Sequence, residues 1–113
     1  MSKPFKDLSI APDVNSDPRL LSMVDASTRM LASVMGDSAG RVSVRWSRWG
    51  VGDLELAIED DSGKVTTILT EQDVQRELRL HRKLFGIWGN LLQTKLDFLM
   101  RDFNSAEVAS SAI

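Results

Sequence analysis

A repeating apolar pattern runs from residue 71 to about residue 103, and it limits the folds open to this chain more than any other feature. The spacing is that of one face of a helix. The residues on that side are Val74, Leu78, His81, Phe85, Trp88, Leu92, Leu96, Leu99 and Phe103, and the stripe is widened by Leu84, Ile87, Leu91 and Met100. Such a helix spans about 50 Å at ~1.5 Å per residue. A compact domain of this size spans only roughly 35 Å.

This predicted helix carries more apolar surface than one small domain can hide, and exposed patches of that size are rare on monomers. We therefore expect a homodimer through the C-terminal helix. The residues expected to contact the second copy are Leu84, Ile87, Trp88, Leu91, Leu92, Leu99 and Phe103. Two alternatives stay open. The helix bends back at Gly86 or Gly89, where glycine weakens a helix, or the chain belongs to an obligate complex with another protein.

An earlier helix is predicted between residues 17 and 36. Asp17 is a good cap, and Pro18 suits the first helical position, where its missing N–H is no loss. Gly36 can end the helix in a left-handed conformation. The apolar residues between them are Leu20, Leu21, Val24, Leu31, Val34 and Met35. Outside the two helices, residues 1–16 show no period and predict an irregular arm, and residues 104–113 predict a flexible tail.

Three strands are predicted between the helices. Apolar and polar residues alternate over residues 41–47 and 53–59, as in strands with one buried face, and a third strand covers residues 65–69. Glycines between the first two strands suit a turn. Residues 60–64 predict a tight hairpin with Gly63 in a left-handed conformation. Residues 70–73 resemble a capping box that starts the long helix.

The fold class is therefore α+β: a helix, a three-stranded antiparallel sheet and a long C-terminal helix, which form a single domain over residues 17–103.

The stretch RVSVRWSRWG, residues 41–50, concentrates arginine and tryptophan. An antiparallel register of the first two strands buries Trp46 and gives two of the three arginines acidic neighbours, which favours an ordinary strand. The pairs expected are Trp46 with Leu54, Val44 with Leu56, Val42 with Ile58, Arg45 with Glu55, and Arg41 with Glu59. Arg48 and Trp49 break the alternation, and we expect them to contact a partner protein.

The composition excludes several classes of chemistry. The chain has no cysteine, which excludes disulfides and thiolate sites. Its only histidine, His81, has Glu77 at helical spacing, and two such residues are too few for a metal site. Neither a phosphate-binding loop nor a catalytic triad spacing is present, so we expect no metal, no cofactor and no enzyme activity.

The charge and hydropathy of the chain bear on its location and on nucleic acid. A net charge of −2 gives no general attraction to nucleic acid or to an anionic membrane. Neither a signal peptide nor a membrane span of roughly 18 apolar residues is visible. We expect a soluble cytoplasmic protein with no membrane association.

The leading hypothesis is a non-catalytic dimeric protein-binding module, as in an adaptor, an assembly factor or a chaperone-like regulator. The order helix, three strands, helix is similar to the first part of small acidic bacterial secretion chaperones. Those proteins dimerise through a helix, but they continue with further strands and a last helix that this sequence lacks. The analogy implies a class of function, protein binding, and not membership.

Two alternatives complete the set. The first is a nucleic-acid-associated factor that uses residues 41–49, with Arg79, Arg82 and Lys83 as an additional patch. Five acidic residues between Asp53 and Asp61 oppose a phosphate backbone, so nucleic-acid binding is not expected. The second is a small enzyme with carboxylates in a dimer cleft.

Overall fold

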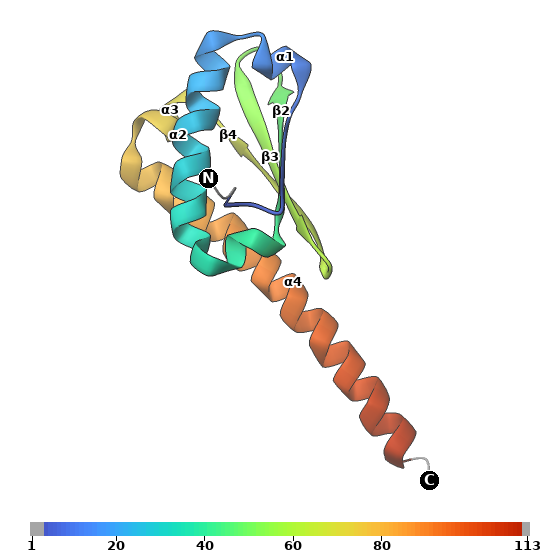
Figure 1. Cartoon of the computed structure of the whole chain (residues 1–113). Helices are drawn as coiled ribbons and strands as arrows, with labels where there is room; N and C mark the ends of the chain where they lie inside the picture. Colours follow the sequence, from blue (N-terminus) through green and yellow to red (C-terminus); the bar gives the residue numbers. More distant parts are fainter. Residues whose placement is uncertain (1–3, 112–113) are drawn as a thin grey trace.

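The computed structural model describes the backbone of residues 4–111 and the side chains of residues 4–101. In chain order the elements are β1 (Asp7–Ile10), α1 (Pro12–Asn15), α2 (Pro18–Met35), the 3-10 helix η1 (Gly36–Arg41), β2 (Ser43–Trp49), β3 (Asp53–Asp60), β4 (Gly63–Leu69), α3 (Glu71–Gln75) and α4 (Glu77–Ser111). The strands lie in the order β1-β2-β3-β4 in one sheet, and α2 and α4 pack together beside it (Figure 1). The α+β class is confirmed.

The sheet has four strands and is mixed, so the prediction of three antiparallel strands is wrong. The additional strand β1 runs parallel to β2, with Leu8 opposite Val44. It lies within residues 1–16, where an irregular arm was expected. Phe5 and Val14 are buried on either side of β1 and anchor this segment to the core. A strand of four residues is too short to show a clear alternation, which is why the sequence pattern did not reveal it.

Helix α2 begins and ends where its sequence predicts. Asp17 Oδ1 accepts hydrogen bonds from the backbone N–H groups of Arg19 at 3.0 Å and Leu20 at 3.4 Å. Pro18 is the first helical residue, and Gly36 ends the helix with φ 58°. The buried apolar residues of α2 are Leu20, Met23, Val24, Leu31 and Met35. They form the helix layer of the core against the sheet.

The β2–β3 turn is tighter than expected, and this moves the register by two residues. β2 continues as far as Trp49, which pairs with Asp53. Trp46 therefore lies opposite Leu56, two residues beyond its predicted partner. Gly50 in the turn has φ 61°, a conformation that glycine adopts readily because it has no Cβ. The predicted register is wrong because the alternation pattern does not fix the length of the turn.

The new register removes both predicted pairs of opposite charge. Arg45 lies opposite Ala57 instead of Glu55. Arg41 belongs to η1 and not to β2, so it has no place opposite Glu59 in the ladder. Because the shift is an even number of residues, the same side chains still face the core. Trp46 is fully buried, as predicted.

The β3–β4 hairpin lies against α4. Its turn consists of Asp61 and Ser62, and Gly63 pairs with Asp60. Gly63 has φ 157°, and a Cβ at this position would approach Cγ2 of Thr94 on α4 to 2.8 Å. A glycine is therefore required here for the close contact between the hairpin and the helix.

The segment predicted as one long helix forms two helices in the structure. Thr70 and Asp73 form the predicted capping box at the start of α3. Arg76 then has an extended conformation, with φ −109° and ψ 103°, and separates α3 from α4. α4 continues without a break through Gly86 and Gly89, so the bend considered at these glycines is absent. It extends to Ser111, beyond the end that the pattern predicted at residue 103.

Only the first part of α4 belongs to the body of the domain. Leu80, Leu84, Ile87 and Leu91 are at most 2% exposed and complete the core. After Leu91 no described α4 side chain belongs to the buried core, but the tip of the β3–β4 hairpin still lies beside Thr94, Lys95 and Leu99. Beyond the hairpin the helix projects away from the body (Figure 1). The molecule therefore measures 62 × 30 × 25 Å.

Candidate association surface on the C-terminal helix

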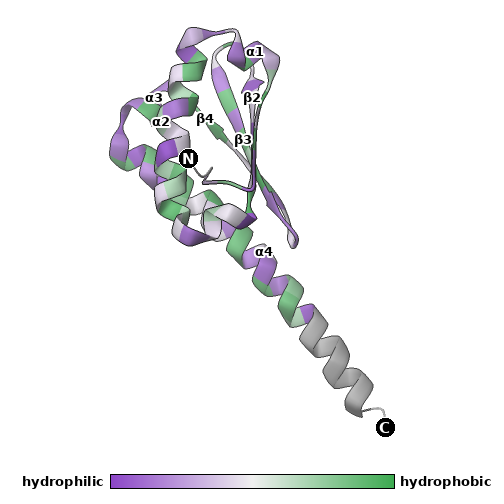
Figure 2. Cartoon of the chain, in the orientation of Figure 1, coloured by the Kyte–Doolittle hydropathy of each residue, from purple (hydrophilic) through white to green (hydrophobic). Residues whose placement is uncertain are grey.

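α4 has two apolar faces. Successive residues of a helix are about 100° apart, so the core residues from Leu80 to Leu91 form one line, the inner face. A second line lies about 130° around the helix from the first. We call it the outer seam, and it consists of Leu78, Arg82, Phe85, Gly89, Leu92, Leu96 and Leu99. Figure 2 shows hydrophobic residues continuing along α4 after it leaves the body.

The large side chains of the outer seam are exposed. The exposed fractions are Leu78 83%, Phe85 59%, Leu92 45%, Leu96 51% and Leu99 53%. A half-exposed side chain of this size leaves on the order of 100 Å² in water, so the seam exposes roughly 500 Å² of apolar surface. That is near the upper end for the largest apolar patch of a typical monomer, and such patches usually mark an interaction site.

The spacing along the outer seam is typical of helix pairing. Its positions alternate in steps of four and three residues, which is the a/d pattern of a heptad repeat. Near the body, the rings of His81 and Phe85 stack with centroids 6.0 Å apart. A shallow, open hollow lies there over Gly86, bordered by Leu78, His81, Arg82 and Phe85. The surface therefore offers both a repeating ridge and a hollow for the side chains of another helix.

Three of the predicted contact residues do not lie on this surface. Leu84, Ile87 and Leu91 are buried in the core of the same chain, because α2 and the sheet cover the inner face. The sequence pattern does not distinguish a stripe covered by the chain itself from one left open. This assignment to a partner contact is therefore corrected.

The other predicted contact residues of α4 have different positions. Leu92 and Leu99 lie on the outer seam and are about half exposed. Trp88 is half-buried at the side of the helix. Phe103 lies outside the described side chains.

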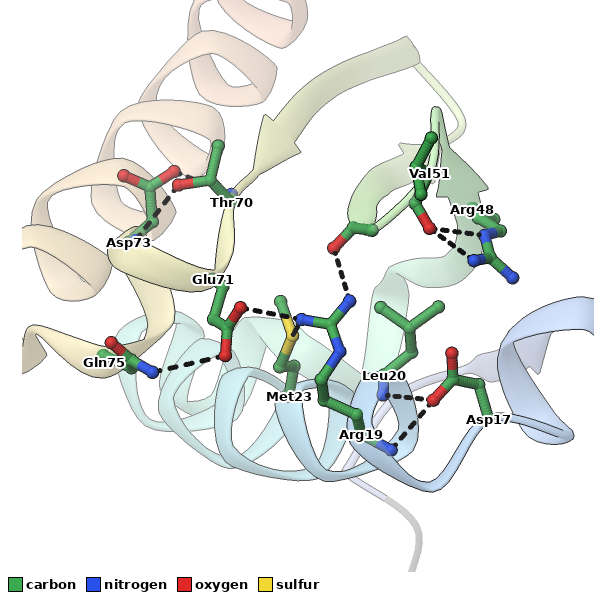
Figure 3. Close-up of polar contacts among 11 residues, drawn as sticks. Asp17, Arg19, Leu20, Met23, Arg48, Val51, Thr70, Glu71, Asp73 and Gln75 are labelled. Carbon is green, nitrogen blue, oxygen red and sulfur yellow. Dashed lines mark hydrogen bonds and ion pairs between the residues drawn. The ribbon is translucent and has the colours of Figure 1, made fainter.

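Arg48 is engaged with its own turn. Its Nε donates to the carbonyl oxygen of Val51 at 3.2 Å, and Nη2 donates to the same oxygen (Figure 3). From α2, Arg19 Nη2 donates to the carbonyl oxygen of Gly52 at 3.2 Å, and Arg19 Nη1 pairs with Glu71 at 2.9 Å. The prediction that Arg48 serves a partner therefore has a competing explanation, because both arginines hold the β2–β3 turn in place.

Trp49 is exposed at 53%, and Val51 beside it at 90%. They form a small apolar tip at the end of the sheet opposite the β3–β4 hairpin.

The cationic groups expected to join Trp49 in binding nucleic acid are less available than the sequence suggested. Arg48 is hydrogen-bonded to the turn, and Arg45 lies on the outer face of the sheet near Asp7 and Glu59. The absence of nucleic-acid binding tighter than generic weak association stays a prediction.

Asp73 is a buried carboxylate that sequence reasoning assigned only to a helix cap. Its side chain is 0% exposed, and Oδ2 accepts a hydrogen bond from the backbone N–H of Thr70 at 2.9 Å (Figure 3). Lys83 Nζ lies 3.1 Å from Oδ2, and Arg79 Nε lies 2.5 Å from Oδ1. Burial raises the pKa of Asp73, but the hydrogen bonds from Thr70 and Lys83 outweigh it and lower the pKa from 3.8 to about 2. Asp73 thereby fixes the start of α4 to α3.

This contact predicts a specific dependence of stability on pH. The folded pKa of Asp73 lies below the unfolded value, so its contribution is complete above pH of about 4 and is lost as pH falls through about 2. We expect Asp73→Asn to lower the free energy of unfolding by about 1–2 kcal/mol at neutral pH, after allowance for solvent around the two cations. Urea unfolding of both proteins between neutral and acidic pH measures the difference. It should shrink towards pH of about 2, and a constant difference would contradict the assignment.

Other kinds of site find no structural support in the part of the chain that is described. Within residues 4–101, no three His, Cys, Asp or Glu side chains are grouped so that they could hold a metal ion. No helix of the described residues has the length and hydropathy needed to cross a membrane. Comparison of the chain with protein-family models, with curated proteins and with solved structures finds no match. The functional inference therefore rests on the surface of this molecule.

Proposed function

We propose that this chain is a non-catalytic protein-binding module that forms a homodimer through the outer seam of α4. The observation that carries the proposal is the row of exposed large apolar side chains at heptad spacing. A second copy of the chain provides the same row, so a two-fold contact would bury both at once.

The area of the seam agrees with what a stable dimer needs. A standard interface buries about 800 Å² on each partner. In homodimers about 65% of that area is apolar. The roughly 500 Å² exposed by the large seam residues meets this requirement on its own. Within the described residues the five large seam side chains stay 45–83% exposed, and of these Leu99 borders the β3–β4 hairpin.

The projecting half of α4 gives a second argument for a partner helix. Leu91 is the last α4 residue that belongs to the buried core among the side chains described. In proteins a helix gains most of its stability from packing an apolar face and not from the intrinsic propensity of its residues. A partner along the seam would supply this packing for Leu92, Leu96 and Leu99.

Dimerisation would also suit the role of an adaptor, an assembly factor or a chaperone-like regulator. Each dimer would carry two copies of the body and two copies of the tip formed by Trp49 and Val51. Two linked contact points bind a partner more tightly than one, because the second contact becomes intramolecular. Such a role requires only binding at the seam and no catalytic residue there.

Hydrogen exchange at two protein concentrations tests this function. We expect the backbone amides of residues 92–101 to exchange faster after dilution, because loss of the partner leaves this part of α4 without packing. The amides of β3, in the centre of the sheet, serve as the internal control and should keep their protection. Equal protection of residues 92–101 over a thousandfold dilution, with a monomer mass throughout, would exclude the proposal.

A further inference from the structure

We infer that the two α4 helices of the dimer run antiparallel, in a register that places Gly89 of each copy opposite Leu92 of the other. The inference rests on the proposed function, since it requires that the seam joins two copies. It follows from the two seam positions that depart from the apolar pattern, Arg82 and Gly89. These positions decide which arrangement of two identical seams is complementary.

A parallel arrangement in register places each seam residue opposite its own copy. Arg82 would then meet a second Arg82 inside an apolar seam, and two like charges would lose solvent together. Gly89 would meet a second Gly89, and the absence of both side chains would leave a void between the helices. Both defects lie next to Phe85, in the middle of the contact.

The antiparallel arrangement removes both defects. Gly89 lies opposite Leu92, so a small residue receives a large one from the other copy. Phe85 lies opposite Leu96, and Arg82 lies opposite Leu99. The aliphatic stem of an arginine can cover a leucine while its guanidinium stays in water. Every seam position between Arg82 and Leu99 thus has a partner of suitable size and charge.

The surroundings of the seam agree with this arrangement. The body of each copy packs on the inner face of α4, about 130° away, and leaves the large seam residues from Leu78 to Leu96 exposed, while Leu99 borders the β3–β4 hairpin. In the antiparallel register, Lys95 of one copy lies beside the half-buried ring of Trp88 of the other. A lysine ammonium next to a tryptophan ring is a favourable cation–π contact. The projecting half of each helix would cover the exposed patch around Phe85 on the other copy.

Cysteine cross-linking tests the orientation, because the natural chain contains no cysteine. Arg82→Cys and Leu99→Cys are made separately, and both are oxidised, or treated with a short bis-maleimide, alone and as a mixture. We expect covalent dimers only in the mixture. Two copies of residue 82 lie about 25 Å apart in the antiparallel register, at ~1.5 Å per residue, and a disulfide cannot span that distance. Asn90→Cys, on the side of α4 away from the seam, is the control and should not cross-link.

The outcomes separate this inference from the proposed function. Covalent dimers of each single variant alone would show a parallel pair and overturn the antiparallel inference. A dimer mass by light scattering with no cross-link in the mixture would overturn the register and leave the dimer intact. The pair Phe85→Cys and Leu96→Cys repeats the test if Arg82→Cys or Leu99→Cys does not fold. A monomer mass for the wild-type chain would remove the proposed function itself.

Discussion

Replacing Trp46 by alanine is expected to lower the free energy of unfolding by about 3–5 kcal/mol. Trp46 is 0% exposed and lies opposite Leu56 in the centre of the sheet. Its Nε1 donates a hydrogen bond to Thr28 Oγ1 on α2 at 3.1 Å. The substitution therefore leaves a large cavity between the sheet and α2 and also removes the partner of a hydroxyl group.

Urea unfolding at one fixed protein concentration measures this loss. Trp49→Ala is the matched control, because Trp49 is on the same strand but is 53% exposed. Its effect should stay below about 1 kcal/mol, as for most surface substitutions. Similar losses for the two tryptophans would show that the orientation of β2 is wrong.

The double substitution Leu92→Glu with Leu96→Glu is expected to convert the dimer into a folded monomer. Both leucines are about half exposed in the single chain, so the body tolerates the change. In the dimer, each glutamate would lose water without gaining a cationic partner, which costs several kcal/mol. A loss of about 4 kcal/mol weakens the dimer roughly a thousandfold.

Sedimentation velocity of the variant measures the change in mass, and circular dichroism reports whether the body stays folded. The control carries Asn90→Glu with Arg101→Glu, two exposed positions on the opposite side of α4. The control should keep the mass of the wild type. Dissociation of both variants to the same extent would attribute the effect to added negative charge and not to the seam.

Features encoded by neighbouring residues could be predicted from the sequence. The start of α2 depends on the side chain of Asp17, which caps the backbone N–H groups of Arg19 and Leu20, and its end depends on Gly36. The burial of Trp46 follows from the alternation of its own strand. The capping box from Thr70 to Asp73 spans only four residues.

Features that depend on distant contacts could not be predicted. β1 is held by parallel pairing with β2, more than thirty residues away, and its own four residues carry no pattern. The register of β2 and β3 depends on the conformation of Gly50 in the turn. Arg76 interrupts the long helix although arginine favours helices, and Asp73 binds Arg79 and Lys83 from the next helix across this break.

The candidate surface was predicted in part. The excess of apolar residues on α4 was visible, and Leu92 and Leu99 are exposed as a contact surface requires. The inner face and the outer seam could not be separated from the sequence. An apolar residue on a helix gives the same sequence pattern whether its own chain or another chain covers it. Only the fold shows that Leu84 faces the core and that Phe85, its neighbour, faces solvent.

The mass of the wild-type chain in solution tests the proposed dimer most directly. The chain has a mass of 12.6 kDa, and light scattering at high micromolar concentration is expected to give twice that value. The mass should fall towards that of a single chain on dilution, in the same range as protection of residues 92–101 is lost. A constant mass of 12.6 kDa at high micromolar concentration, with the fold intact, would contradict dimerisation through the outer seam.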